Sequence, residues 1–190
     1  MSWIETYTGK KFYPLNPRPG DVSIIDIAHS LSMQCRFNGH TRLFYSVAEH
    51  SIIVSKELAA AGYGWILQLY GLLHDAAEAY VCDLPRPIKN QIKEYRPIEA
   101  KIQEVIWQAF NLSSPTEQDR KTLQEMDDRI LGYEGVMLMH NVEARTAKLP
   151  YYRLKASSIM GLSEIVAEDE FLALFHVDNK TSLVKNVKNG

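Results

Sequence analysis

The sequence has few cysteines, no long apolar run and no excess of either charge. Cys35 and Cys82 are its two cysteines, and neither belongs to a C-x-x-C pair, which argues against a disulfide framework and excludes a zinc ribbon. No segment reaches the roughly 18 apolar residues that a membrane span needs, so we expect no membrane partner. The formal net charge is −2, and we therefore expect no nucleic-acid partner either.

The remaining bulk properties are those of one globular domain. The chain has 190 residues, of which 46% are hydrophobic and 23% charged. Its first residues lack the basic start and the apolar run of a signal peptide. Two cysteines fit a reducing compartment, and we expect a cytoplasmic protein.

Helical periodicity dominates the chain after residue 20. We predict an all-α fold, a compact helical domain over residues 21–178. An extended segment over residues 1–20 precedes it, with a short hairpin across Tyr7 to Tyr13, and a polar tail over residues 179–190 follows it. The expected helices run from Ile24 to Asn38-Gly39, from Ser46 to Gly62, from Trp65 to about Val81, briefly beyond Pro85, from Pro97 to Phe110, from Pro115 to about His140, and from Ser163 to His176.

One adjacent pair, His74-Asp75, stands near the end of the apolar stretch that begins at Trp65. Glu78 and Asp83 follow within a few residues. Burying charge there costs several kcal/mol unless the charge is paired or holds a metal. This segment is therefore the first place to look for function.

Four residues are candidates for one divalent-metal site, namely His50, His74, Asp75 and Asp127. Imidazole and carboxylate ligands suit cobalt, zinc, manganese, iron or nickel. Two histidines and two carboxylates leave coordination positions open, as a catalytic site needs. Each signal alone is weak, since a lone histidine in a helix is more often a structural residue than a ligand.

Ordinary alternatives exist for the surrounding charges. Glu49 is the capping-box partner of Ser46, at the spacing that starts a helix. Asp127 and Asp128 fit an exposed, salt-bridged helix face, and Asp83 fits the cap of the next helix. Only the joint pattern is specific.

That joint pattern resembles the HD-domain phosphohydrolases. More narrowly, it resembles the branch of bacterial 5′-deoxynucleotidases and phage-encoded HD enzymes, which includes the phage dATP triphosphohydrolases. The resemblance runs from about Arg36 to Glu134, and residues 7–14 also resemble the phage proteins. The segments that carry it are Ser46-Val47-Ala48-Glu49-His50-Ser51, His74-Asp75-Ala76-Ala77-Glu78, Asp83-Leu84-Pro85-Arg86-Pro87-Ile88-Lys89, and Asp127 with Glu134 seven residues later.

The resemblance implies roles for the metal ligands and the acids. It assigns His50, His74, Asp75 and Asp127 to one divalent metal, with Asp128 as the competitor for the last position. Glu78 matches the acid that orients or deprotonates the attacking water. Asp83 matches a second acid at the reacting phosphate or ribose.

Other residues are expected to contact the substrate. Arg36-Phe37 matches an Arg-aromatic pair that grips phosphate and packs at the sugar or base, although Phe37 replaces a tryptophan of the relative. The alternative for Arg36 is a cation at a helix C-terminus. Lys89 and Lys93, four residues apart, are expected on one helix face, where they either contact a polyphosphate or form a solvated basic face. His40 and Arg42 are further phosphate candidates.

These residues together predict a metal-dependent hydrolase of the 5′-phosphate ester of deoxynucleotides. The preferred version is a dATP or dNTP triphosphohydrolase, with magnesium accompanying the substrate phosphates. The alternatives are a 5′-deoxynucleotidase that acts on dNMPs and a non-catalytic nucleotide-binding module. The resemblance also implies a homo-oligomer, either a dimer or a hexamer.

Overall fold

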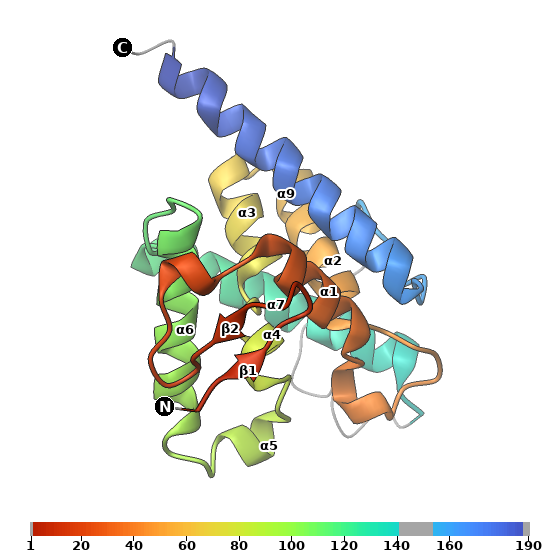
Figure 1. Cartoon of the computed structure of the whole chain (residues 1–190). Helices are drawn as coiled ribbons and strands as arrows, with labels where there is room; N and C mark the ends of the chain where they lie inside the picture. The colour runs from red at the N-terminus through yellow and green to blue at the C-terminus, as the bar shows by residue number, and fades with distance from the viewer. Residues whose placement is uncertain (1, 141–153, 188–190) are drawn as a thin grey trace.

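The computed structural model describes residues 2–140 and 154–187, with side chains described as far as Val177 (Figure 1). The all-α expectation is confirmed, and a two-stranded sheet is the one addition to the helices in the described residues. The elements in chain order are β1 (Ile4–Glu5), β2 (Lys11–Phe12), η1 (Pro19–Asp21), α1 (Ile24–Met33), η2 (Arg36–Gly39), α2 (Val47–Ala60), α3 (Trp65–Leu73), α4 (Glu78–Val81), α5 (Arg86–Lys89), α6 (Tyr95–Ala109), α7 (Glu117–Leu138) and α9 (Glu164–Val187).

Helix α2 is the centre of the molecule. It packs against α1, α3, α7 and α9, and residues 47–55 are buried without interruption. A helix that is buried all round has no solvent face on which to place polar residues. The polar side chains of α2, among them Glu49 and His50, are therefore buried in the core.

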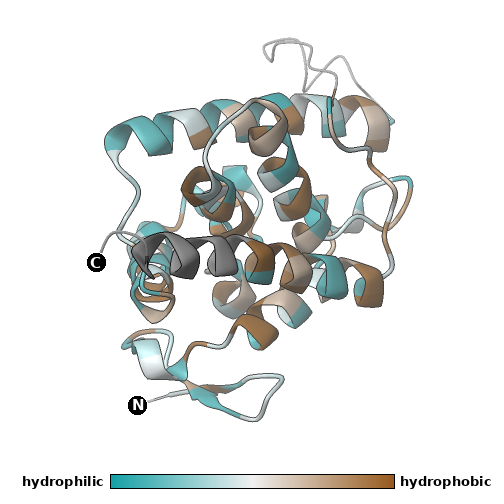
Figure 2. Cartoon of the chain, turned by 90° about the horizontal axis from the view of Figure 1, so that it is seen from above, coloured by the Kyte–Doolittle hydropathy of each residue, from teal (hydrophilic) through white to brown (hydrophobic). Residues whose placement is uncertain are grey.

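The last helix covers the first three. Figure 1 shows α9 crossing α1, α2 and α3, with its C-terminal end reaching beyond them, and contacts with all three helices support this arrangement. Figure 2 shows hydrophilic and hydrophobic residues alternating along the helices, as amphipathic packing requires. Among the described helices, none combines the length and the apolar character that a membrane crossing demands.

The N-terminal hairpin is confirmed in kind and shifted in position. β1 pairs with β2 in antiparallel register, with Ile4 opposite Phe12, so the first strand precedes the expected Tyr7–Tyr13 span and the second lies within it. Gly9 in the connection has a φ of 79°, which glycine adopts without strain. Asp26 of α1 then holds the turn, because it accepts hydrogen bonds from the backbone and the hydroxyl of Thr8.

The prediction of one helix from Trp65 to Val81 is wrong. α3 ends at Leu73, residues 74–77 form a turn, and α4 begins at Glu78. The cause is the side chain of Gln103 on α6. Its amide accepts from the Ala77 N–H at 3.0 Å and donates to the Leu73 carbonyl at 2.9 Å, so it is inserted where a helix would join those two groups directly.

Other helix boundaries also differ from the expected ones. α1 ends at Met33, because Cys35 is extended and bridges Ser46. Thr116 caps α7 with Asp119 in a full capping box, so Pro115 precedes the cap instead of occupying the first turn. α7 ends at Leu138, and α9 extends to Val187, into the segment that we expected to be a polar tail.

Two buried carboxylates of α2 hold the chain that leads into α9. Glu57 accepts hydrogen bonds from the backbone N–H groups of residues 155–157, and Glu49 accepts from those of residues 160–162, at 2.7–3.1 Å. Ser46 caps α2 as expected, through the Glu49 N–H. The reciprocal capping-box role of the Glu49 side chain is wrong, because that carboxylate serves a segment far away in sequence.

We predict that Gly71→Ala destabilises the protein. A Cβ at Gly71 would lie 2.5 Å from Leu58 Cδ1 and 3.1 Å from Val54 Cγ1, where α3 meets α2. Leu58 is fully buried and has little room to move, so overpacking should outweigh the gain in helix propensity by about 1–2 kcal/mol. Calorimetry should show a melting temperature lower by a few degrees.

Gly64→Ala is the matched control, because a Cβ there meets nothing within 4 Å. Its expected loss is below about 1 kcal/mol, since Gly64 is the N-cap of α3, where alanine is less favoured than glycine. An unchanged melting temperature for Gly71→Ala would show that Leu58 moves freely, contrary to the tight packing of α2 on α3.

Candidate functional site

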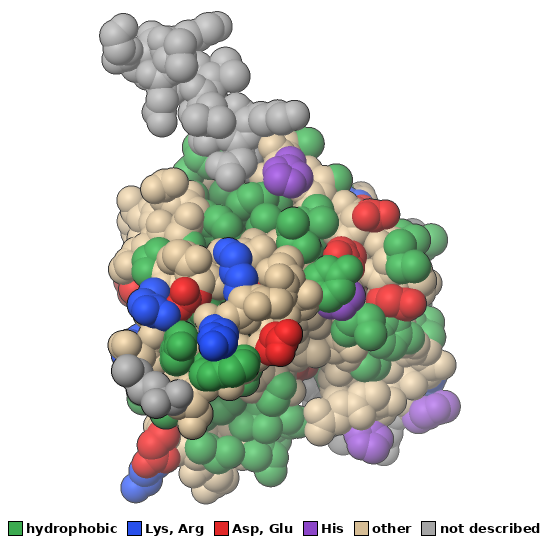
Figure 3. All heavy atoms as spheres, viewed as in Figure 1, with side chains coloured by type: hydrophobic (Ala, Val, Ile, Leu, Met, Phe, Trp, Pro, Cys, Tyr) green, Lys and Arg blue, Asp and Glu red, His purple; other side chains and the backbone are tan. Residues whose placement is uncertain are grey.

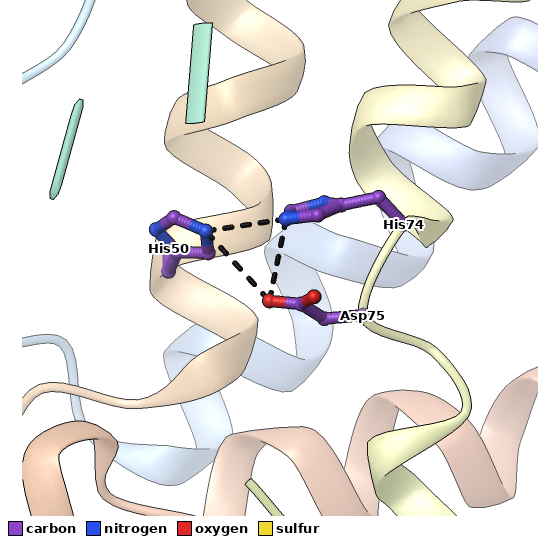
Figure 4. Close-up of side chains that lie close together, drawn as sticks. All are labelled: His50, His74 and Asp75. Atoms are coloured by element: carbon purple, nitrogen blue, oxygen red, sulfur yellow. Dashed lines mark hydrogen bonds and ion pairs between the residues drawn. The ribbon is translucent and has the colours of Figure 1, made fainter. Parts of the chain in front are cut away.

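Three of the predicted ligands lie together at the centre of the helical core. His50 comes from α2, and His74 and Asp75 come from the turn after α3 (Figure 4). His50 Nε2 is 3.3 Å from His74 Nε2 and 3.8 Å from Asp75 Oδ2, and His74 Nε2 is 3.2 Å from Asp75 Oδ2. Tetrahedral zinc ligands at their usual bond lengths lie roughly 3.3–3.6 Å apart. These three side chains therefore form a cluster that could hold a metal ion.

The Nδ1 atoms of both imidazoles already have hydrogen-bond partners. His50 Nδ1 lies 2.6 Å from Glu134 Oε1, and His74 Nδ1 lies 2.8 Å from the Gly71 carbonyl. A carboxylate and a carbonyl accept hydrogen bonds, so each Nδ1 carries the proton. In the neutral rings both Nε2 lone pairs then face each other and nearby carboxylate oxygens, an arrangement that needs a positive charge between them.

Asp127 of α7 lies beside this cluster. Its Oδ1 lies 3.2 Å from His50 Nε2. Asp128 turns elsewhere, since it accepts from Gln124 and lies 3.8 Å from Arg86. The geometry thus favours Asp127 over its neighbour.

Glu134 contacts three of the side chains at this centre, those of His50, Tyr45 and Arg36. It is fully buried, two turns of α7 after Asp127, and accepts from His50 Nδ1 and from the Tyr45 hydroxyl at 2.7 Å. Arg36 joins it from the η2 turn, with Nη2 3.2 Å from Glu134 Oε2 and Nη1 3.4 Å from Asp75 Oδ2. The alternative role of Arg36 as a helix C-terminal cation is excluded, because α1 ends at Met33.

The charges of this centre determine its pKa values. Burial alone would lower the pKa of His74, but the charges of Asp75 and Asp127 raise it to about 9. Burial alone would raise the pKa of Asp75, but His74, His50 and Arg36 hold it well below its usual range. The protein therefore keeps Asp75 ionised and places strong negative potential at the imidazole Nε2 atoms.

The two predicted acids line the same pocket. Glu78 is buried, and burial together with the charges of Asp75 and Asp83 raises its pKa to about 9. Its Oε1 accepts from Lys89, whereas its Oε2 has no hydrogen-bond partner among the described residues. Burial is also the main cause of the raised pKa of Asp83.

The two lysines do not share a helix face. Lys89 lies between two carboxylates, with Nζ 3.1 Å from Glu78 Oε1 and 2.7 Å from Glu99 Oε1. α5 ends at Lys89, and Lys93 falls in the connection to α6, exposed and away from the residues that line the pocket. The expectation of a common basic face is wrong because the helix is one turn long.

The pocket has a volume of about 800 Å³, within the range of small-molecule sites. Its wall includes Phe37 and His40 in and beside η2, Arg86 on α5 and Arg96 on α6. Phe37 has a φ of 56°, and the Arg36 guanidinium lies over its ring at 5.5 Å. The face drawn in Figure 3 shows acidic, basic and hydrophobic side chains intermixed, with no extended basic patch.

Sequence reasoning singled out the candidate ligands and missed much of their support. It used Glu134 only as a spacing marker, although seven residues after Asp127 means two turns along the same helix face. Tyr45 and Glu99 were not singled out, because their importance depends on contacts with distant residues. Arg86 was given no role in the sequence analysis, and the structure places it on the pocket wall within 4.0 Å of Asp127.

Two curated proteins are similar to this chain, and no protein-family model matches it. The uncharacterized protein YfdR of Escherichia coli is 42% identical over 112 residues, which are 59% of this chain and 60% of YfdR. An uncharacterized protein of Rhodobacter capsulatus is 37% identical over 116 residues, which are 58% of this chain and 59% of that protein. The chain thus spans about three-fifths of the length of the curated relatives it matches.

We predict that Glu134→Gln weakens metal binding without removing any ligand. The amide cannot supply the negative charge that holds the His50 tautomer, and loss of such a partner typically costs 10- to 100-fold in affinity. Titration with cobalt(II), followed by its visible absorption, measures this change. Asp128→Asn is the control and should bind as the unmodified protein does; equal affinity for both variants would contradict the role of Glu134.

Proposed function

We propose that this chain is a metal-dependent phosphohydrolase of the HD-domain type that acts on the 5′-phosphate ester of deoxynucleotides. The observation that carries the proposal is the pair of imidazole Nε2 atoms, 3.3 Å apart and flanked by Asp75 and Asp127. Each Nδ1 is committed to another acceptor, so both Nε2 atoms are available as ligands. The donor set suits cobalt, zinc, manganese, iron or nickel.

A divalent cation held there would supply Lewis acidity, which would lower the pKa of bound water towards about 7 and offset the charge of phosphate oxygens. The protein's own groups then orient the substrate. Arg36 lines the pocket beside the ligands, and its planar fork suits phosphate oxygens. Arg86 and Arg96 also line the pocket, and we assign them the contacts to a longer phosphate chain.

Glu78 is the proposed proton-transfer group. Its Oε2 lies buried without a partner in the described residues, at the edge of a pocket that contains the ligands. The charge of Asp75 contributes to its raised pKa, so neutralising Asp75 with a cation lowers that pKa and prepares Glu78 to accept a proton. Asp83 is the second acid that lines the pocket, and we assign it to the substrate.

Two versions of the reaction differ in their products. A triphosphohydrolase releases a deoxynucleoside and inorganic triphosphate. Arg86 and Arg96 on the pocket wall favour it, because Arg86 is exposed and its nearest carboxylates, those of Asp127 and Asp128, are as far as 4.0 and 3.8 Å away. A 5′-deoxynucleotidase releases orthophosphate from a dNMP, and the engagement of Lys89 by Glu78 and Glu99 favours it, because that cation is already neutralised. We prefer the triphosphohydrolase, with dATP as the first substrate to test.

Product analysis tests this proposal. The purified protein, loaded with cobalt or manganese, is incubated with each of the four dNTPs and dNMPs, and the products are separated by chromatography. We expect deoxyadenosine and triphosphate from dATP. Orthophosphate from dNMPs alone would reject the triphosphohydrolase version, and no product from any nucleotide would reject the phosphohydrolase; an Asp75→Ala variant controls for contaminating phosphatase.

We further predict that Glu78→Gln separates chemistry from metal binding. The amide keeps the size of the side chain and cannot carry the proton, so turnover should fall by about 10²- to 10⁴-fold. Cobalt(II) affinity should stay within a few-fold, because Glu78 is not among the ligands. Turnover close to that of the unmodified protein would exclude Glu78 as the proton-transfer group.

A further inference from the structure

We propose that two glutamines, Gln103 and Gln34, are positioning residues with separate tasks. Gln103 holds the turn that carries the metal ligands His74 and Asp75. Gln34 holds the next turn, which carries the acids Glu78 and Asp83. The kinetic part of this inference rests on the proposed function, whereas the part that concerns metal binding does not.

Gln103 acts as an inserted peptide group. Its Oε1 accepts from the Ala77 N–H at 3.0 Å and its Nε2 donates to the Leu73 carbonyl at 2.9 Å. In a continuous helix these two backbone groups would bond to each other. The side-chain amide therefore separates the Ala77 N–H from the Leu73 carbonyl by the width of one amide group. His74 and Asp75 lie between these two residues.

The spread turn gives the ligands their directions. The backbone of residues 73–80 bonds three residues apart, as the Ala76 N–H does to Leu73 and the Glu78 N–H does to Asp75, at 3.0 and 2.9 Å. This spacing winds the chain more tightly than an α-helix and rotates successive side chains differently. Both adjacent residues, His74 and Asp75, can then point at His50.

Gln34 makes a second bridge further along the chain, between the backbones of Glu78 and Asp83. It lies at the end of α1, where its Nε2 is 3.2 Å from the Glu78 carbonyl and its Oε1 accepts from the Asp83 N–H at 3.1 Å. The same Nε2 also donates to the Ser30 hydroxyl at 3.1 Å, which fixes the orientation of the amide. One side chain thus connects the backbones of both acids.

The segment between those acids is strained and needs such support. Cys82 has a φ of 67° and a ψ of 158°, a conformation that residues with a Cβ rarely adopt. The Tyr95 hydroxyl donates towards the Val81 and Cys82 carbonyls, at 3.2 and 2.5 Å, and secures one side of the turn. Gln34 secures the other side and directs Asp83 to the pocket wall.

The two bridges predict two different defects, which a general loss of stability would not produce. Gln103→Met keeps the length of the side chain and loses both bonds to the ligand turn, so cobalt(II) affinity should fall at least about 10-fold. Gln34→Met loses both bonds to the acid turn, so cobalt(II) affinity should stay within about 2-fold while kcat falls at least about 10-fold with KM nearly unchanged. Amide hydrogen exchange should accelerate at Ala77 in the first variant and at Asp83 in the second.

Gln68→Met is the matched control, because Gln68 also donates to a backbone carbonyl, that of Tyr63, at the exposed start of α3. It should change neither affinity nor turnover. If Gln103→Met does not fold, Gln103→Glu retains the acceptor for the Ala77 N–H and should show a smaller loss of cobalt affinity.

Equal losses of affinity and turnover in both variants would overturn the division of tasks, and so would unchanged values in both. If the unmodified protein hydrolyses no nucleotide, the proposed function fails. Cobalt titration and hydrogen exchange would still decide the inference, since an unchanged cobalt affinity in Gln103→Met, or unchanged exchange at Asp83 in Gln34→Met, would overturn it.

Discussion

Glu134 and His50 meet in the middle of the helical core, where neither side chain is exposed. Their 2.6 Å contact joins α7 to α2, keeps the proton on His50 Nδ1 and directs Nε2 towards His74 and Asp75. Arg36 and Tyr45 complete the environment of the Glu134 carboxylate. This buried pair fixes the direction of the His50 imidazole, towards which His74, Asp75 and Asp127 converge.

Such a core is costly by the measure of stability alone. Buried ion pairs often contribute less than well-packed apolar side chains of the same volume, because desolvation offsets the attraction between the charges. Here two histidines, three carboxylates and one arginine share the interior or its edge, and each has a partner. A fold that needed only stability has no reason to collect them, which is why the function is sought at this place.

The break between α3 and α4 shows how neighbouring helices shape the site. The apolar residues of α3 favour a longer helix, and the amide of Gln103 interrupts it by taking over one of its backbone hydrogen bonds. Gln34 bonds to the backbone beyond this break, at Glu78 and Asp83. The result is a tight turn beside a strained one, with the candidate ligands His74 and Asp75 on the first and the two acids at the ends of the segment that contains the second. Rigid helices on both sides hold these turns, so the site does not depend on a long loop.

Local patterns in the sequence predicted the helical class, the Ser46 cap of α2 and the ligand candidates His50, His74 and Asp75, because periodicity, caps and residue chemistry act over a few positions. They failed to predict the end of α1, the break in the Trp65–Val81 helix and the role of Glu49. They also placed Lys89 and Lys93 on one helix face, which the structure does not have. The first three failures came from partners further along the chain, such as Gln103 on α6 or the 160–162 backbone, and the last came from a helix of only one turn. The sequence by itself determined which chemical groups are present and which stretches are helical. Only the tertiary structure decided which groups meet, because a side chain can replace a backbone hydrogen bond or orient an imidazole only after the helices that carry both have packed.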